Sequence, residues 1–405
     1  MRAKTAKLTS RTATVTALMA AGLASGTAAR AATPEVVPVA CSAAALAAAI
    51  SNAGDDATLT LTVGCTYRLT AGLPAISGSE SDDLTIAGHG ATLQRSTAPG
   101  TPQFAIIQVD SGGLTVSDLN FRNGVPAINF LGTAALTING GLFSGNKGAG
   151  AITDTSPGAG PVVNDATFTG NTTTGSGGAI YDNPDTEGAI VTNSTFYGNT
   201  AAGSGGAILD TAQGMFSGDV VKDNSAGGEG GGIADADDSS VENCKISGNH
   251  AGAGGGLMLG GFAPVMVTGT SIEGNTAEDG GGIYDPGLEY ENNAQLTDDK
   301  ITGNHASADG GGIYIGNAGT SQGILNLAQT RILHNDADSL GGGNYSAGAV
   351  AAAHSTISHN TAHGGGGIYQ ATEGDGNGVV LTNSAVLHNT PDNCEPPGTI
   401  PGCNG

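Results

Sequence analysis

The chain has 405 residues, 70 of them glycine, with 36 acidic side chains against 13 basic ones and a formal net charge of −23. Such an acidic surface repels phosphate backbones and anionic lipid, so we expect neither nucleic acid nor a membrane surface as a partner. High glycine, strong acidity and few aromatic residues are also typical of disordered chains, so a folded structure has to be inferred from the sequence pattern.

The first 31 residues have the pattern of a Sec-type signal peptide. A basic beginning is followed by an apolar stretch around Val15 to Ala24 and by the cleavage signature Ala29-Arg30-Ala31. No later segment approaches eighteen consecutive apolar residues, so we expect no membrane span after cleavage. The sequence therefore predicts a secreted protein, extracellular or associated with the cell envelope. We also expect the protein to be a monomer.

Export permits disulfides, and four of the five cysteines stand as two close pairs. We predict that Cys41 pairs with Cys65 and that Cys394 pairs with Cys403, which would pin the two ends of the fold. The fifth, Cys244, occupies a repeat position that other repeats fill with serine or threonine. We interpret it as a small buried residue and not as a reactive thiol.

The segment after Cys41 is prone to form a helix. Residues 42–53 read SAAALAAAISNA, and a short helix here would cover the open edge of the first coil of a solenoid. Apolar segments that read as the strands of less regular first coils follow at residues 59–63, 84–86, 104–109 and 114–119. We predict a cap and irregular coils over residues 32–120.

A repeat of about 25 residues appears when the chain is aligned on a recurring asparagine. The aligned residues, at spacings of 25 to 31, are Asn146, Asn171, Asn199, Asn224, Asn249, Asn275, Asn304, Asn335, Asn360 and Asn389. The residue three before each asparagine is apolar, and so is the residue eight before it. Such a period is typical of a solenoid and argues against disorder.

Each repeat is predicted to contain three short strands separated by corners. The two apolar columns differ by five, an odd offset, so one flat strand of period two cannot turn both of them inward. The residue six before the asparagine is mostly of a type that tolerates left-handed geometry, and it would form the corner between them. We expect a second corner at the asparagine, then a third strand in Gly-Gly-Ala-Ile or Gly-Gly-Ile-Tyr segments.

Parallel stacking of such coils predicts an all-β fold, a right-handed single-stranded parallel β-helix with a short N-terminal capping helix. The aligned asparagines are expected to hydrogen-bond along the stack as a ladder. We predict regular repeats over residues 121–390 and a disulfide-closed end over residues 391–405.

The repeats resemble those of a known family. Over residues 143–208, Phe-Ser-Gly-Asn, Phe-Thr-Gly-Asn and Phe-Tyr-Gly-Asn alternate with Gly-Gly-Ala-Ile. These strings resemble the FxxN and GGA[ILV] repeats of chlamydial polymorphic outer membrane proteins, over roughly residues 120–390. Later coils depart to Ile-x-Gly-Asn and Gly-Gly-Gly-Ile-Tyr. The resemblance implies a β-helical, adhesin-like passenger.

A row of tyrosines is the first candidate site. Tyr284, Tyr314, Tyr345 and Tyr369 follow the inward residue of the third strand in four successive coils, so alternation turns them outward. They could bind glycans by stacking on sugar rings and by hydrogen bonding through their hydroxyls. The alternative is an aromatic ladder that only stabilises the sheet.

A column of aspartates is the second candidate site. Asp182, Asp210 and Asp235 stand two residues after the inward isoleucine in three successive coils. Three interpretations are open: solvated charges that keep the protein soluble, a Ca²⁺ site, or the acid and base of a glycoside hydrolase.

A row of histidines is the third candidate site. The residue directly before the aligned asparagine is a histidine in three successive coils, at His334, His359 and His388. These residues are either exposed turn residues or a group that binds a metal or responds to acid.

Together these patterns predict a secreted, non-catalytic, adhesin-like binding protein whose partner is an extracellular glycan or another cell-surface component. The alternative is a polysaccharide lyase or glycoside hydrolase, since many such enzymes use this architecture. An enzyme needs a groove walled by long loops, and the repeat spacings leave room for short insertions only. The sequence assigns no catalytic residues, and Ca²⁺ is the one cofactor it suggests.

Overall fold

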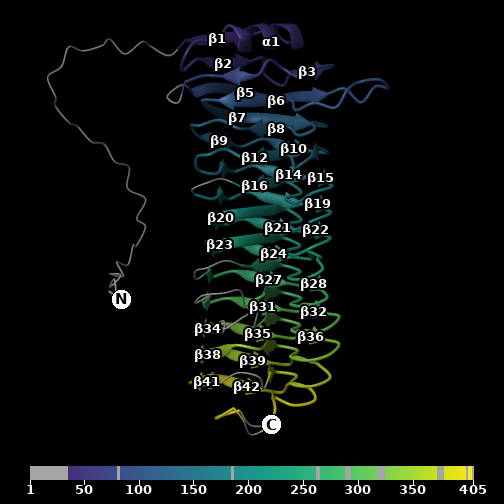
Figure 1. Ribbon diagram of the computed structural model, residues 1–405, viewed down its shortest axis with the longest axis vertical. Coiled ribbons are helices and arrows are strands. Elements are labelled where there is room, and N and C mark those ends of the chain that lie inside the picture. Colours follow the sequence, from purple (N-terminus) through teal and green to yellow (C-terminus); the bar gives the residue numbers. More distant parts are fainter. Residues whose placement is uncertain are drawn as a thin grey trace, which may run out of the picture. The chain divides into compact units, whose positions relative to one another are not determined.

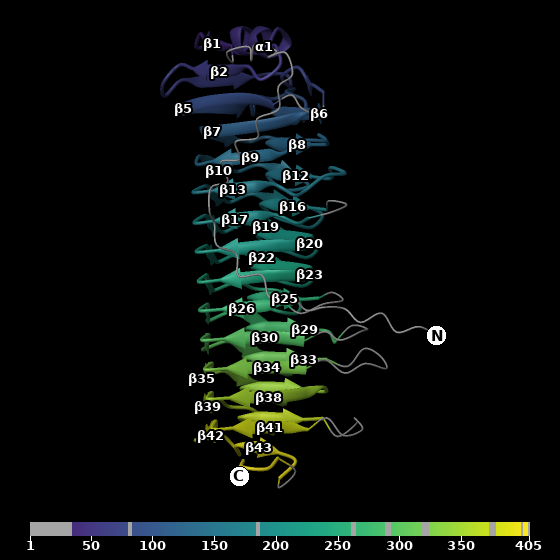
Figure 2. The ribbon, with the colours of Figure 1, turned by 90° about the vertical axis from the view of Figure 1, so that its left-hand side faces the viewer.

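The computed structural model describes residues 35–79, 83–183, 187–260, 265–287, 293–316, 324–371, 378–397 and 400–403. These residues form a parallel β-solenoid of about 13 turns, stacked along one axis (Figures 1 and 2). The predicted signal peptide, residues 1–31, lies outside the described residues. None of the helices in the described ranges is long and apolar enough to cross a membrane.

Each coil contributes one strand to each of three parallel faces, which we call faces A, B and C in chain order. Face A contains β1 (Val36–Val39), β2 (Thr58–Leu61), β5 (Asp83–Arg95), β7 (Gly113–Arg122), β9 (Leu136–Asn139), β13 (Val162–Asn164), β17 (Ile190–Thr192), β20 (Ile208–Ser217), β23 (Ile233–Glu242), β26 (Met266–Thr268), β30 (Asn293–Thr297), β34 (Ile324–Ala328), β38 (Ala349–Ala353) and β41 (Val379–Thr382). The long strands β5 and β7 continue onto face B, and β20 and β23 arrive from face C.

Faces B and C stack in the same way. Face B continues with β3 (Thr66–Leu69), β10 (Leu142–Ser144), β14 (Thr167–Thr169), β18 (Thr195–Tyr197), β21 (Val220–Lys222), β24 (Lys245–Ser247), β27 (Ser271–Glu273), β31 (Lys300–Thr302), β35 (Arg331–Leu333), β39 (Thr356–Ser358) and β42 (Ala385–Leu387). Face C adds β4 (Ile76–Ser77), β6 (Ile107–Ser111), β8 (Ile128–Phe130), β12 (Ile152–Asp154), β16 (Ile180–Asp182), β25 (Leu257–Leu259), β29 (Ile283–Asp285), β33 (Ile313–Ile315), β37 (Asn344–Ser346), β40 (Ile368–Gln370) and β43 (Cys394–Glu395).

The glycine-rich segment between faces B and C, which we call the arc, also contains short strands. The sequence pattern predicted no strand in this segment. Two small parallel sheets contain β11 (Lys147–Gly148), β15 (Thr172–Thr173), β19 (Thr200–Ala201) and β22 (Ser225–Ala226), then β28 (Thr276–Ala277), β32 (His305–Ala306) and β36 (Asp336–Ala337). Single bridges through His250 join the two sheets into one row.

Three left-handed residues turn each of the regular coils around Asn146 to Asn360. In the coil that contains Asn199 they are Asn193 (φ 51°), Gly198 (φ 63°) and Gly205 (φ 69°). The predicted corner six residues before the asparagine is therefore confirmed, and every residue at that position has positive φ from Asp165 to Asn383. The second corner falls one residue earlier than expected, just before the asparagine, so that the asparagine itself turns into the coil.

In each coil, every face contributes at least one inward side chain to the interior. The predicted apolar columns on faces A and B are buried, except for the partly buried Leu381 in the last coil, and the isoleucine of the third strand is buried as well. Inside face B, the rings of Phe121, Phe143, Phe168 and Phe196 stack with centroids 4.6 to 4.9 Å apart. The three predicted strands per coil and the parallel stack are thus confirmed.

The aligned asparagines form a continuous buried ladder. In Asn249, for example, Oδ1 accepts from the backbone N and from Nδ2 of Asn224, at 2.9 and 3.0 Å. Its own Nδ2 donates to the Val221 carbonyl and to Asn275 Oδ1, both at 3.0 Å. Because each side chain satisfies polar groups of the coils on either side, the ladder fixes the register from coil to coil.

A second polar column lines the corner between faces A and B. Ser194, Thr270 and Ser355 accept hydrogen bonds from backbone amides of neighbouring coils, and Asp219 and Asp299 do the same. Burial raises the pKa values of both aspartates to about 7. Cys244 occupies this column, is 3% exposed and has its pKa raised to about 12, chiefly by burial.

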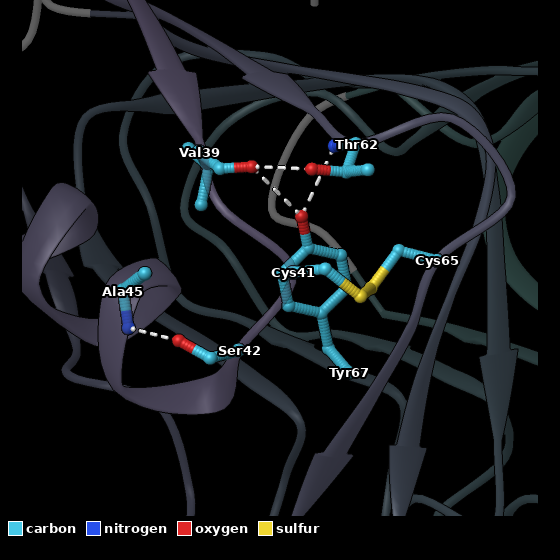
Figure 3. Close-up of a disulfide and its surroundings, with 7 residues drawn as sticks. All are labelled: Val39, Cys41, Ser42, Ala45, Thr62, Cys65 and Tyr67. Carbon is cyan, nitrogen blue, oxygen red and sulfur yellow. Dashed lines mark hydrogen bonds between the residues drawn. A yellow bond between two sulfur atoms is a disulfide. The ribbon is translucent and has the colours of Figure 1, made fainter.

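The first coil is closed by a helix and a disulfide (Figure 3). Helix α1 (Ala43–Ser51) begins at the N-cap Ser42, whose side chain accepts from the Ala45 amide at 3.1 Å, and it lies at the end of the stack (Figures 1 and 2). Cys41 and Cys65 are joined with their Cα atoms 5.8 Å apart. Beside them the hydroxyl of Tyr67, a fully buried residue, donates to the Val39 carbonyl at 3.1 Å.

The last coil is closed by the second predicted disulfide, between Cys394 and Cys403. Cys394 begins β43, which pairs with β40 and ends face C. Both disulfides therefore lie at the two ends of the solenoid, where a coil has a neighbour on one side only. There they restrain strands that stacking supports least.

The corners differ in how much their length varies. From β9 onward, two residues always separate the face A strand from the face B strand, as between Asn164 and Thr167. The passage from face C to face A varies from none, within β20 and β23, to eight residues between Ile315 and Ile324. The differences in repeat spacing therefore arise largely at the corner between faces C and A.

Replacement of Asn249 by alanine tests the ladder. We expect a loss of about 2–4 kcal/mol in the free energy of unfolding, because the variant leaves two buried donors of Asn224 without an acceptor and removes the hydrogen bond from Asn249 Nδ2 to the Val221 carbonyl. Denaturant unfolding followed by circular dichroism measures it. The exposed neighbour provides the control, His250→Ala, expected within about 0.5 kcal/mol of the parent. Equal effects of the two changes would contradict the role given to the ladder.

Candidate functional site

The four predicted tyrosines stand in register on adjacent strands of face C. They come from β29, β33, β37 and β40, and their rings stack with centroids 5.2, 4.8 and 5.5 Å apart. All four side chains are half-buried. Stacking covers the ring faces within the row, so that a ligand meets ring edges and hydroxyls. We call this group the Tyr row.

Acidic residues accompany the Tyr row in the turns that precede the same strands. Asp279 Oδ1 accepts from the Asp309 amide at 3.0 Å, and Asp309 Oδ1 accepts from the Leu340 amide at 2.8 Å. Burial, followed by the charges of Asp279 and neighbouring groups, raises the pKa values of Tyr284, Tyr314 and Tyr345 above that of free tyrosine. These phenols therefore remain protonated, as hydrogen-bond donors, at all physiological pH values.

The predicted aspartates form a column in the interior of the coil. Asp154, Asp182, Asp210 and Asp235 are partners in register on β12, β16, β20 and β23, and each is at most 1% exposed. The column is interrupted by Leu259 and resumes at Asp285. Their position two residues after the inward isoleucine turns them inward too. They are therefore not the solvated charges that formed one of the three interpretations.

The column lies at the turn from face C to face A. Asp210 Oδ1 accepts from the Ala212 amide at 2.9 Å, and Oδ2 accepts from the Ala189 amide at 3.0 Å. Glycine leaves room for these carboxylates, since a Cβ at Gly188 would lie 2.6 Å from both oxygens of Asp210. The geometry is that of a side chain that satisfies the backbone at a corner.

Burial governs the protonation of the column. It raises the pKa of Asp182 to about 9, with the charges of Asp210 and Asp154 as further causes. It also raises the pKa values of Asp154 and Asp285 to about 6. Asp182 is thus protonated at neutral pH. A polysaccharide on the surface cannot contact these carboxyl groups, so the geometry does not offer them as a catalytic pair.

The three histidines form an exposed stack beside face B. Ring centroids of His334 and His359 are 5.1 Å apart and those of His359 and His388 are 5.2 Å apart. All three occupy the left-handed corner position just before the asparagine, with φ of 54°, 57° and 58°. They are the exposed turn residues of the first interpretation, brought into register by the ladder.

One cluster was not singled out from the sequence. His305, Asp336 and Asp338 lie on the arc of two successive coils, with one potential ligand atom from each lying within 4.8 Å of the others. His305 Nδ1 is 3.0 Å from Asp336 Oδ2. The sequence does contain a signal for this cluster, because His305 and Asp336 each directly follow an aligned asparagine. It appears only when the columns after the asparagine are compared as well as those before it.

Comparison with known proteins agrees with the architecture. Residues 162–328 match the family model described as the right-handed beta helix region. The A-module of mannuronan C-5 epimerase AlgE6 from Azotobacter vinelandii is similar at 14% identity and a TM-score of 0.32, over 85% of this chain and 94% of that one. No curated protein shows significant sequence similarity to the chain. The family match supports the conclusion that the fold is a right-handed parallel β-helix.

The buried aspartates make stability depend on pH. Folding raises the pKa of Asp182 from 3.8 to about 9, so the folded state holds a proton that the unfolded state releases between these values. The contribution of this proton to the free energy of unfolding is complete below pH 3.8. It declines by up to about 1.4 kcal/mol per pH unit as the pH rises to 9. We expect Asp182→Asn to flatten the fall in melting temperature between pH 5 and pH 9.

Melting is followed by circular dichroism at five pH values across this range. The matched control is Asp110→Asn, at an exposed aspartate on face C, which should leave the slope unchanged. Equal slopes for the parent and Asp182→Asn would show that the buried carboxyl does not control this dependence.

Proposed function

We propose that this chain is a secreted, non-catalytic binding protein that holds a linear, neutral glycan along face C. The observation that carries the proposal is the Tyr row. Each of four successive coils presents one phenol, and the four stand in register on adjacent strands. A straight array with a regular repeat suits a polymer better than a small compact ligand.

The chemistry of the row favours hydrogen bonding over ring stacking. Since neighbouring rings cover each other, sugar rings cannot insert between them, and contact would be made through phenol hydroxyls at the ring edges. The half-exposed carboxylates of Asp279 and Asp309 add acceptors beside these donors. Sugar hydroxyls both donate and accept, so a mixed row of this kind matches them.

Charge indicates which glycans fit. Asp279 and Asp309 flank the row, and the charge of Glu229 also acts on Tyr284. Uronate or sulfate groups would be repelled at this face, whereas neutral sugars would not. The proposal is therefore for neutral glycans, such as those of a cell envelope, consistent with an adhesin-like role.

The extracellular setting rests on separate support. The expected signal peptide and the two disulfides suit an oxidising compartment. The alternative of a lyase or hydrolase gains no support from the aspartates once proposed for it, because Asp182, Asp210 and Asp235 are enclosed within the coil. Ca²⁺ bound by these three residues would likewise be an interior ion and not a bridge to a sugar.

Affinity electrophoresis of the purified protein in gels that contain neutral or acidic polysaccharides tests the proposal. We expect retardation by at least one neutral glucan, mannan or galactan and none by polygalacturonate. The double variant Tyr314→Phe, Tyr345→Phe keeps the stacked rings and removes two hydroxyls. It should bind about tenfold more weakly, at about 0.5–1.5 kcal/mol for each hydrogen bond lost.

Tyr181→Phe is the matched control, on the same face but outside the row. It should bind like the parent, and all variants should keep the parent melting temperature to within a few degrees. Full retention by the double variant, no binding across the neutral panel, or release of new reducing ends or unsaturated uronates would overturn the proposal.

A further inference from the structure

The arc places one imidazole and two carboxylates together on the outside of two successive coils. His305 belongs to β32 and Asp336 to β36, and these residues are partners in a parallel ladder. Asp338 follows Asp336 by two residues. Ala306 and Ala337, next to them in sequence, are buried, so alternation turns the three polar side chains outward.

The backbone holds all three residues in place. The amide of His305 donates to the Asn275 carbonyl, that of Asp336 to the Asn304 carbonyl and that of Asp338 to the Ala306 carbonyl, each at 2.9 Å. Asn275 and Asn304 are members of the buried ladder. The backbone positions of His305 and Asp336 are thus tied to the buried ladder, which lowers the entropy that ligand binding would cost.

The spacing of the donor atoms matches that around one metal ion. Zinc binds imidazole nitrogen and carboxylate oxygen at about 2.0–2.2 Å, so that two ligand atoms on one tetrahedral ion lie about 3.3 Å apart. The separation of His305 Nδ1 from Asp336 Oδ2 is 3.0 Å, and the third donor lies within 4.8 Å. A small change in side-chain torsion angles would bring the three donor atoms to the separations that one ion requires.

We propose that His305, Asp336 and Asp338 form a zinc site on the arc, separate from the Tyr row of face C. One nitrogen and two oxygen donors suit Zn²⁺, while Ca²⁺ prefers six to eight oxygens and gains little from an imidazole. Three protein ligands leave the fourth position to water. All three side chains are partly or fully exposed, so the site can load after folding.

Isothermal titration of the chelator-treated, tag-free protein with ZnCl₂ tests the site. We expect binding of one Zn²⁺ per chain, weakened about tenfold or more by His305→Gln and by Asp336→Asn. CaCl₂ serves as the comparison ion and should bind more weakly by a similar factor. Melting temperatures in chelator should be the same for all variants, since the cluster is exposed.

The exposed histidine stack provides the matched control. His359→Gln removes an exposed imidazole from another surface of the solenoid and should leave zinc affinity unchanged. The proposal is overturned if the parent binds no zinc, if Ca²⁺ binds as tightly, or if affinity falls in His359→Gln while it persists in Asp336→Asn.

Discussion

The fold depends on how each coil satisfies the backbone groups that a corner turns inward. A buried asparagine such as Asn275 does so with a single side chain, since its Oδ1 accepts twice and its Nδ2 donates twice, to coils on both sides. An apolar residue would leave these groups unpaired, and a charged one would carry a cost of burial. Once the asparagines are in register, every other column follows. The Tyr row, the histidine stack and the cluster on the arc are all consequences of that alignment.

Much of this architecture could be predicted from local chemistry. An odd offset between apolar columns requires a corner, and residues such as Asn193 tolerate the left-handed geometry that it needs. The asparagine ladder and the paired cysteines follow from spacing alone. The arrangement of the tyrosine rings on face C was harder to predict. Whether Tyr314 and Tyr345 stack on each other or splay apart depends on torsions that a one-dimensional pattern does not contain.

The aspartate column shows a different limit. The rule of alternation already placed Asp182 on the same side as the buried Ile180, yet the usual cost of burying a carboxylate favoured an exposed position. The structure resolves the conflict at Asp182 by protonation, whereas Asp210 accepts hydrogen bonds from corner amides. The formal charge of −23 counts Asp182 as ionised, although burial keeps this carboxyl protonated at neutral pH. The cluster of His305 with Asp336 required a comparison of columns one coil apart, which sequence neighbours do not suggest.

The unequal corners have a consequence for how such a chain can change. Between faces A and B, the ladders bind each coil to the next within two residues of a turn, so an insertion there would displace several buried hydrogen bonds at once. Between faces C and A, the connection ranges from none to eight residues while the strands on both sides keep their register. This edge can accept new loops without remaking the core. Insertions, whether natural or engineered, would therefore accumulate along one edge of the solenoid, beside face C, while the corner between faces A and B stays fixed.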